Sequence, residues 1–129
     1  MRTMSIDRKT LSSVGVAEND AGVVVHGELC PRFHRAVELI GRRWTGAIIQ
    51  VLLPQPRRFN ELLGAIPGIS DRLLTERLRE LEAEGIIRRD VLPGAPVRVT
   101  YQLTDCGREL REPLAAIGHW AERWIDAQP

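Results

Sequence analysis

The stretch from Ile69 to Ile86, ISDRLLTERLRELEAEGI, constrains the fold of this chain more than any other. Ser70 is a good N-cap, because its hydroxyl can accept a hydrogen bond from a first-turn N–H group that has no partner within the helix. Gly85 stands where helices often end in a left-handed residue, after which Ile86 can pack back onto the last turn. The stretch therefore predicts one helix with a defined beginning and end.

The two faces of this predicted helix differ in chemistry. At about 100° per residue, leucines recur on one face, which we expect to be core, while polar side chains recur on the other. The core face carries Leu74, Leu78 and Leu81, with Leu73 and Arg77 at its flanks. The opposite face carries Arg72, Thr75, Glu76, Arg79 and Ala83.

A shorter amphipathic stretch comes just before. Its apolar residues, spaced three and four apart, are Phe59, Leu62, Leu63 and Ile66. Asn60 is its expected cap, and Pro67-Gly68 ends it shortly before Ser70. Two helices joined by a tight, glycine-bearing turn predict a helix-turn-helix, in which the second helix lies in the major groove of DNA.

After the long helix, the sequence predicts two strands around a stiff tip. The strands cover residues 86–92 and 97–103, and the tip is Pro93-Gly94-Ala95-Pro96. Strict alternation in the second strand separates a packed side from an open side that carries Arg98. The packed side consists of Val97, Val99, Tyr101 and Leu103. A hairpin directly after a recognition helix indicates the wing of a winged helix, so we expect a mainly α fold with a small β-hairpin.

The regions on either side of this core are expected to differ. Residues 1–28 lack sustained periodicity and predict a flexible N-terminal arm, with Val23–Val25 ordered against a partner. Residues 29–104 then form the winged helix-turn-helix DNA-binding domain, and residues 105–129 form a C-terminal dimerisation helix.

Two short amphipathic helices open the predicted domain. The first has Pro31 at its first position and ends at Gly41. The second includes Trp44 and stops before Pro54, because the residue before a proline disfavours the helical conformation.

The chain ends in a predicted long helix that Thr104 caps and Pro113 kinks. Its larger apolar residues follow heptad-like spacing, in a stripe wider than one small winged domain covers. We expect this stripe to pair with a second copy in a homodimer; the alternative is that the helix folds back on its own domain. The stripe is Leu114, Ile117, Trp120, Ala121 and Trp124.

The composition fits one globular domain rather than a membrane or secreted protein. The 129 residues are 43% apolar, yet no apolar run approaches the ~20 residues of a membrane span. The N-terminus lacks an apolar core followed by a cleavage site, so no secretory signal is expected. Cys30 and Cys106 are too few for a disulfide framework, and a reduced, cytoplasmic setting is therefore expected.

The charge of the chain is nearly balanced, at +1. Its distribution is more informative, because both ends are acidic and the middle is basic, which fits DNA contact by the middle. Lysine and arginine together number 18, and Lys9 is the only lysine. Guanidinium groups suit phosphates and guanine edges, although a high arginine content can also reflect genome composition.

Several motifs follow one another along the chain: C-P, L-I-G-R-R-W-T, R-R-F-N-E-L, I-P-G-I-S, L-T-E-R-L-R-E-L-E-A-E-G-I-I-R-R and V-R-V-T-Y-Q-L-T-D-C-G-R-E-L. From Cys30 to Trp124 they strongly resemble the HxlR-type winged-helix transcriptional regulators, relatives of the MarR group. The resemblance implies a homodimer that binds pseudo-palindromic operator DNA, with its N-terminal and C-terminal helices at the dimer interface. The arm of residues 1–28 is longer than this family pattern.

The resemblance also implies where DNA is contacted. The recognition helix would present Ser70, Asp71, Arg72, Thr75, Glu76 and Arg79. In the wing, Arg98 would meet the DNA backbone or the minor groove. Arg58, which leads into the helix-turn-helix, and Arg88, on the first wing strand, complete the predicted contacts.

Cys30 is a candidate sensor. In some members of the family a cysteine just before the first helix senses oxidants or electrophiles, and Cys30 occupies the matching place. With Pro31 at the first helical position, Cys30 lies at a helix N-terminus, where partial positive charge favours the thiolate. The alternative is a small buried apolar residue at the dimer interface. For Cys106, ordinary packing is expected.

Neither an enzyme nor a metal protein is expected. Cys30 and His34, one helical turn apart, could serve as nucleophile and base, but no third orienting group or oxyanion-stabilising loop is visible. A metal site would need His26, Cys106 or His119 to join this pair, and the spacing supports only the pair. No cofactor is expected, because the glycines do not form a phosphate-binding loop.

The sequence therefore predicts a transcriptional regulator, most simply a repressor, that binds double-stranded DNA as a homodimer and responds to an oxidant or small-molecule effector. The alternative is a winged helix used for protein–protein contact, which would carry an acidic or apolar outer face on the recognition helix. The actual face combines two arginines with Thr75 and Glu76, which favours bases and phosphates.

Overall fold

The computed structural model describes residues 17–18, 24–25 and 30–127. These residues belong to two compact units, and the chain passes from the first to the second between Arg42 and Arg43. The division of function among residues 1–28, 29–104 and 105–129 stays a prediction.

The first unit contains a short ladder and one helix. Strand β1 (Ala17–Glu18) pairs antiparallel with β2 (Val24–Val25), so Val24 and Val25 are ordered against the same chain. The rest of the predicted arm lies outside the described residues. Helix α2 (Pro31–Ile40) has proline at its first position and Gly41 as its C-cap, as predicted.

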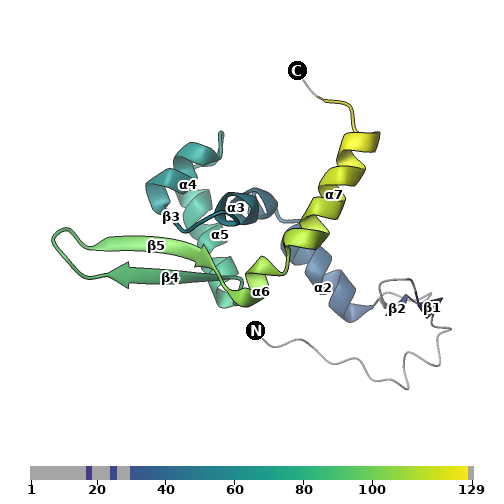
Figure 1. The fold of residues 1–129 in the computed structure, drawn as a ribbon, viewed down its shortest axis with the longest axis horizontal. Helices are drawn as coiled ribbons and strands as arrows, with labels where there is room; N and C mark the ends of the chain where they lie inside the picture. Colours follow the sequence, from purple (N-terminus) through teal and green to yellow (C-terminus); the bar gives the residue numbers. More distant parts are fainter. Residues whose placement is uncertain (1–16, 19–23, 26–29, 128–129) are drawn as a thin grey trace. The chain divides into compact units, whose positions relative to one another are not determined.

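The second unit is a winged helix-turn-helix (Figure 1). Helix α3 (Thr45–Leu52) is followed by α4 (Phe59–Ala65) and by the recognition helix α5 (Asp71–Ala83). Their apolar faces form the core together with the base of the wing. The most deeply buried large residues are Ile48, Ile49, Leu62, Leu74, Leu78 and Leu81.

Both ends of α5 are formed as the sequence predicts. The Ser70 hydroxyl accepts a hydrogen bond from the backbone N–H of Leu73, over 3.1 Å. Gly85 has φ of +77°, and the N–H of Ile86 then donates to the carbonyl of Leu81 over 2.9 Å. This is the bond of a Schellman motif, which satisfies a carbonyl that the end of the helix leaves without a partner.

The wing is part of a three-stranded antiparallel sheet of order β3-β5-β4. Strands β4 (Ile87–Leu92) and β5 (Arg98–Leu103) form the predicted hairpin, which extends far from the helices in Figure 1. The third strand, β3 (Arg57–Arg58), was not predicted from the sequence, because two residues are too few to show a period. It pairs with Tyr101 and Thr100 of β5.

Two details at the starts of helices differ from the sequence predictions. Trp44 is not part of the second helix; it is the N-cap of α3, with a left-handed φ of +78°. Asn60 lies inside α4, and Arg58 is the N-cap instead. The backbone N–H of Arg58 donates to the carboxylate of Glu61 over 2.8 Å, so the acidic side chain in the first turn supplies the bond expected from a cap.

The predicted single C-terminal helix is two helices. Thr104 caps α6 (Asp105–Arg108) by accepting from the N–H of Gly107, and α7 (Arg111–Trp124) follows after a break. Pro113 is in the first turn of α7, where an N–H has no partner within the helix, so proline costs no bond there. The predicted kink at this proline is therefore wrong; the interruption falls before the helix. Among the described residues, no helix is long and apolar enough to cross a membrane.

Candidate nucleic-acid interface

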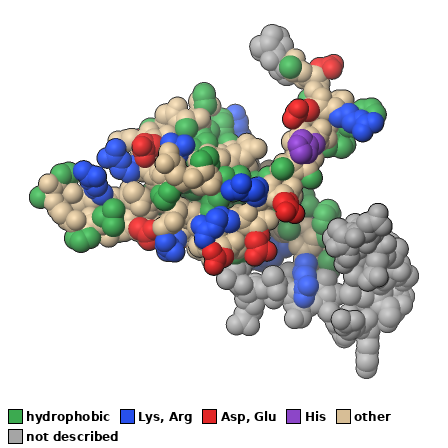
Figure 2. Space-filling view, in the orientation of Figure 1, with side chains coloured by type: hydrophobic (Ala, Val, Ile, Leu, Met, Phe, Trp, Pro, Cys, Tyr) green, Lys and Arg blue, Asp and Glu red, His purple; other side chains and the backbone are tan. Residues whose placement is uncertain are grey.

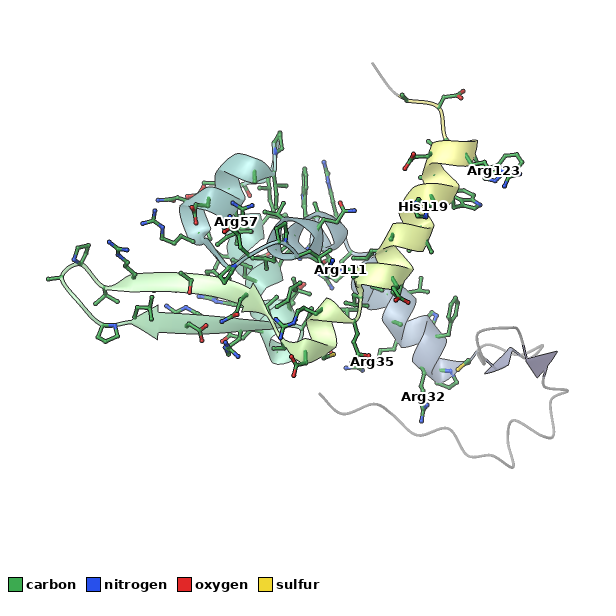
Figure 3. The ribbon with its side chains drawn as sticks, in the orientation of Figure 1. Arg32, Arg35, Arg57, Arg111, His119 and Arg123 are labelled. Atoms are coloured by element: carbon green, nitrogen blue, oxygen red, sulfur yellow. The ribbon has the colours of Figure 1, made fainter. Side chains whose placement is uncertain are left out.

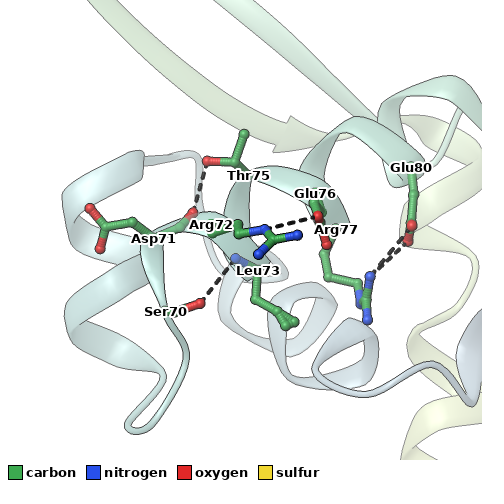
Figure 4. Close-up of polar contacts among 8 residues, drawn as sticks. All are labelled: Ser70, Asp71, Arg72, Leu73, Thr75, Glu76, Arg77 and Glu80. Carbon is green, nitrogen blue, oxygen red and sulfur yellow. Dashed lines mark hydrogen bonds and ion pairs between the residues drawn. The ribbon is translucent and has the colours of Figure 1, made fainter.

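The outward face of α5 presents the two predicted arginines to solvent. Arg72 and Arg79 are both exposed, and the side chain of Arg72 is 89% accessible. Arg72 Nε lies 3.5 Å from Glu76 Oε1, one turn along the helix (Figure 4). Exposed ion pairs of this kind contribute little to stability, so the guanidinium of Arg72 can exchange Glu76 for a phosphate or a base at small cost.

Two other predicted contacts, at the start of α5, have hydroxyl groups that bond within the helix. The hydroxyl of Ser70 caps the first turn, and the hydroxyl of Thr75 donates to the carbonyl of Asp71 over 2.8 Å (Figure 4). Thr75 is half-buried, whereas Ser70 and Asp71 are exposed. The two hydroxyl groups therefore stabilise the first turns of α5.

Arg77 has a role that the sequence did not reveal. Its side chain is buried, and its Nε donates to the backbone carbonyl of Arg43 over 2.9 Å. Its Nη1 also lies 3.3 Å from Glu80 Oε1. The only signal in the sequence was its position beside the leucines of α5, where a long side chain can bury its methylene stem.

One face of the sheet gathers the other predicted arginines. Residues that are directly paired across antiparallel strands point to the same side of the sheet. Arg58 is paired with Thr100, and Arg88 is paired with Gln102. Arg98, Thr100 and Gln102 are every second residue of β5, so their side chains point to the same face. The three arginines Arg58, Arg88 and Arg98 therefore lie on one face of the sheet. Figure 2 shows basic side chains along the hairpin and the adjacent helices.

Asp90 lies on this same face and orients Arg88. Its carboxylate accepts from Arg88 Nε over 2.9 Å and from Gln102 Nε2 over 2.6 Å. The bond from Gln102, followed by that from Arg88, holds the pKa of Asp90 below its ordinary value. An ionised Asp90 thus fixes one edge of the Arg88 guanidinium and leaves its other nitrogens available.

The far end of the wing is apolar and exposed. Ile87 and Leu103, paired at its base, are buried, whereas Val91, Leu92 and Val97 at its tip are at least half exposed. The packed side predicted for β5 therefore covers only the base, and the prediction is wrong for Val97. Hydrophobic side chains are visible at this tip, at the left of Figure 2.

Comparisons with known proteins match this geometry. The model of the HxlR-like helix-turn-helix family matches residues 39–129. The chain belongs to this family. The HTH-type transcriptional regulator YvaP of Bacillus subtilis is 48% identical over 99 residues, which cover 77% of this chain and 92% of YvaP. YodB, another HTH-type transcriptional regulator of that organism, is 43% identical over 76% of this chain and 88% of its own.

Solved structures of such regulators share the fold. The reduced form of YodB superposes with a TM-score of 0.71 at 41% identity, covering 79% of this chain and all of YodB. YodB has also been solved after diamide treatment and with a quinone bound. The redox regulator HypR in its oxidised form superposes with a TM-score of 0.70 at 37% identity, covering 76% of this chain and all of HypR. These relatives are named as transcriptional or redox regulators.

The candidate sensor of this family member is the N-cap of α2. Cys30 is half-buried, and its carbonyl accepts the first helical bond, from the N–H of His34, over 2.9 Å. The imidazole of His34 lies 3.4 Å from the carboxylate of Glu38, one turn further on. Within the described part of the chain, no group of three or more His, Cys, Asp or Glu side chains could hold a metal ion. Cys106, in α6, is half-buried.

Helix α7 exposes most of the predicted dimerisation stripe. Ile117, Trp120 and Trp124 are exposed, by 54%, 57% and 66%. Ala121 is half-buried. Leu114 is already buried by residues of its own chain, so it does not need a second copy to cover it. His119 and Arg123 lie along the same helix (Figure 3), and the Arg123 guanidinium is 5.5 Å from the Trp124 ring centre.

Proposed function

We propose that this HxlR-family protein is a repressor that binds a pseudo-palindromic operator as a homodimer and releases it when Cys30 is modified. The observation that carries the proposal is the exposed, arginine-bearing face of α5. Arg72 and Arg79 stand about two helical turns apart on it. Three further arginines share one face of the adjoining sheet. A repressor needs no more than to occupy its operator, and these surfaces suit that task.

The recognition helix would read bases, and the sheet would contact the backbone. Arginine pairs with the O6 and N7 edge of guanine in the major groove, and it also binds phosphate oxygens. We expect one of Arg72 and Arg79 to contact a guanine and the other a phosphate. Arg58, Arg88 and Arg98 would then contact phosphates or the minor groove beside the half-site.

Base recognition by Arg72 and Arg79 can be tested on an operator that the wild type selects from a random pool of duplexes. Arg72→Ala and Arg79→Ala are each compared with the wild type by fluorescence anisotropy on the selected duplex and on its single-base variants. Loss of a base-reading arginine should cost ~1–3 kcal/mol and relax specificity at one base step. Arg111→Ala, at the start of α7, is the matched control and should bind as the wild type does. If both helix variants bind as tightly and as selectively as the parent, α5 is not the reader.

The salt dependence of binding separates DNA recognition from protein–protein contact. Each phosphate contact adds ~0.9 to the slope of log affinity against log salt concentration. Arg98→Ala should therefore weaken binding to operator and random DNA alike and lower this slope by about one. A loss confined to the operator would instead make Arg98 a sequence reader. A wild type that selects no sequence and shows no salt dependence would favour the protein-contact alternative.

The exposed stripe of α7 supports the homodimer. Burial of one large aliphatic side chain is worth ~1.5–3 kcal/mol, so a stripe from each of two chains could hold a dimer at micromolar concentration. A two-fold dimer would place its recognition helices in successive major grooves, ~34–36 Å apart. The expected footprint is a pseudo-palindrome with half-sites one helical turn apart.

Cys30 is the proposed site of regulation. YodB has been solved with a quinone bound and after diamide treatment, and HypR is named a redox regulator. Cys30 is the N-cap of α2, directly before Pro31, and it is half-buried. Treatment with a quinone, to which a single thiol adds covalently, should release the wild type from its operator, and Cys30→Ser should stay bound. Cys106→Ser is the control and should still be released. If Cys30→Ser is released like the wild type, Cys30 is not the sensor.

A further inference from the structure

The two faces of the sheet β3-β5-β4 differ in charge. Ile87 and Leu103 are paired at the base of the wing and are both buried, so the face that carries them packs on the helices. We call this face the inner face. The opposite face carries Asp90 among its arginines, whereas the inner face has no carboxylate among the described residues of the three strands.

A tyrosine lies between two arginines on the inner face. Tyr101 of β5 is paired with Arg89 of β4 on one side and with Arg57 of β3 on the other. Directly paired residues point to the same side of a sheet, with Cβ atoms about 4.5–5.5 Å apart. Tyr101 is two positions from Leu103 along β5, so all three side chains belong to the inner face. They form a row across the sheet, next to the buried base of the wing.

The side chains of this row are accessible. Arg89 is exposed, and Arg57 and Tyr101 are half-buried. Arg57, labelled in Figure 3, lies 3.5 Å through its Nε from the backbone carbonyl of Val51 in α3. This bond holds the guanidinium on the helix side of the sheet and uses only one of its three nitrogens.

The two arginines of the row have no acidic partner among the described residues. Three of the arginines already assigned to DNA lie 3.9, 3.5 and 2.9 Å from a carboxylate; these pairs are Arg58 with Glu61, Arg72 with Glu76 and Arg88 with Asp90. Arg57 and Arg89 stand two strand spacings apart, about 10 Å, with a phenol between them. An anion placed over the phenol would meet two uncompensated guanidinium groups, which suit the oxygens of a phosphate.

We propose that Arg57, Tyr101 and Arg89 form a binding site for a backbone phosphate of DNA on the inner face of the wing. The inference rests on the proposed function and adds a second face to it. A hairpin that enters a groove has a sugar–phosphate strand on each side, so the arginines of the opposite face and the inner-face row can contact different strands. The guanidinium groups bind phosphate oxygens, and the hydroxyl of Tyr101 donates a further hydrogen bond.

The salt dependence of binding tests the two arginines. The probes are the selected duplex and a random-sequence duplex, measured by fluorescence anisotropy. Arg57→Ala and Arg89→Ala should each lower the salt slope by ~0.9, which weakens binding to both duplexes about eightfold near 0.1 M salt. Arg89→Lys keeps the charge and should keep the slope. Arg111→Ala is the matched control and should keep both affinity and slope.

The hydroxyl of Tyr101 gives a different signature. Tyr101→Phe removes a donor but no charge, so it releases no fewer counterions from the DNA. Affinity for both duplexes should fall roughly tenfold, the lower range for a hydrogen bond to a charged group, and the salt slope should not change. Wild-type affinity in Tyr101→Phe would overturn the part of this residue in the site.

Neutral phosphates distinguish a direct contact from a loosened wing. Each phosphate of the selected duplex is replaced in turn by an uncharged methylphosphonate. At the contacted position this replacement should weaken binding by the wild type and have little further effect on Arg57→Ala or Arg89→Ala, because the contact is already lost. A wing that is merely less stable would lose affinity without coupling to one phosphate, and that result would overturn the site.

The outcomes separate this site from the proposed function. If the wild type binds the selected duplex and both alanine variants keep its affinity and salt slope, the phosphate site is overturned and operator binding stands. A loss confined to the selected duplex would also overturn it, because the row would then read bases. If the wild type binds neither duplex, operator binding fails and the phosphate site fails with it.

Discussion

Helices α5 and α7 have almost the same length and amphipathic character, yet they bury very different parts of themselves. Of the 13 residues of α5, Leu74, Arg77, Leu78 and Leu81 are buried. Of the 14 residues of α7, only Leu114 is buried. An apolar stripe thus predicts that a face will be covered, and it does not say whether the covering comes from the same chain or from another.

The exposed faces of these two helices also differ in chemistry. The face that α5 leaves exposed is polar and carries Arg72 and Arg79, whereas the face that α7 leaves exposed carries Ile117 and two tryptophans. Charged contacts are screened by salt and apolar contacts are not. We therefore expect DNA binding by α5 to weaken steeply as salt rises and self-association through α7 to change little.

The largest effect is expected on the side of α7. Ile117→Asp would place one carboxylate from each chain in the proposed dimer interface of α7. The dimer would lose two buried aliphatic side chains, worth ~1.5–3 kcal/mol each, and would also have to bury charge. Dimers at tens of micromolar should become monomers by light scattering, and these should bind only a single half-site weakly. Ala115→Asp, which puts the same charge on the opposite face of α7, should leave the dimer intact. A wild type that is already monomeric at this concentration, with Ile117→Asp still binding the operator normally, would show that the exposed stripe is not an interface.

The next effect is expected on the buried side of α5. Leu74 is completely buried, so Leu74→Ala should lower the free energy of unfolding by ~2–5 kcal/mol through lost transfer energy and the cavity left behind. Urea denaturation at two protein concentrations measures it. The loss should be the same at both concentrations, because the partner of Leu74 is in its own chain. Ile117→Ala should instead cost stability mainly through the dimer and therefore depend on concentration. If the stability loss depends on protein concentration in the same way in both variants, α5 and α7 do not differ in whether their apolar face is covered by their own chain or by a second copy.

The smallest effect is expected at Asp90, on the charged face of the wing. Its pKa is lowered by the bonds from Gln102 and Arg88, so its folded state favours the carboxylate. This contribution to stability is present above the unfolded pKa, near 3.9, and is lost as pH falls through the lower folded value. The protection of amides in β4 and β5, taken as the intrinsic exchange rate at each pH divided by the observed rate, should therefore fall as the pH falls below about 4. Asp90→Asn should remove this acid-dependent step, whereas Asp126→Asn, in the exposed C-terminal segment, should retain it. If Asp90→Asn shows the same acid-dependent loss of amide protection as the wild type, a group other than Asp90 causes that loss.

The sequence alone determined the features that depend on neighbouring residues. The cap by Ser70 and the left-handed Gly85 act within one turn of α5, so residue identity and spacing are enough to predict them. The leucines of α5 and the alternation of β5 follow from helical and strand periods in the same way. These patterns identified the winged helix-turn-helix, and the resemblance of the motifs led to the HxlR family and to the candidate arginines.

Tertiary structure decided the features that depend on residues far apart. Arg77 and Arg43 are 34 positions apart, and no local pattern distinguishes a buried arginine that binds a distant carbonyl from one that flanks a core. Strand β3 exists because β5 returns beside it, and its two residues have no period of their own. Trp44 adopts its left-handed φ where Gly68 leaves room for the ring. Helix caps and periodic patterns depend on residues a few positions apart, so the sequence shows them directly. The contacts of Arg77, β3 and Trp44 form only when folding brings distant segments of the chain together.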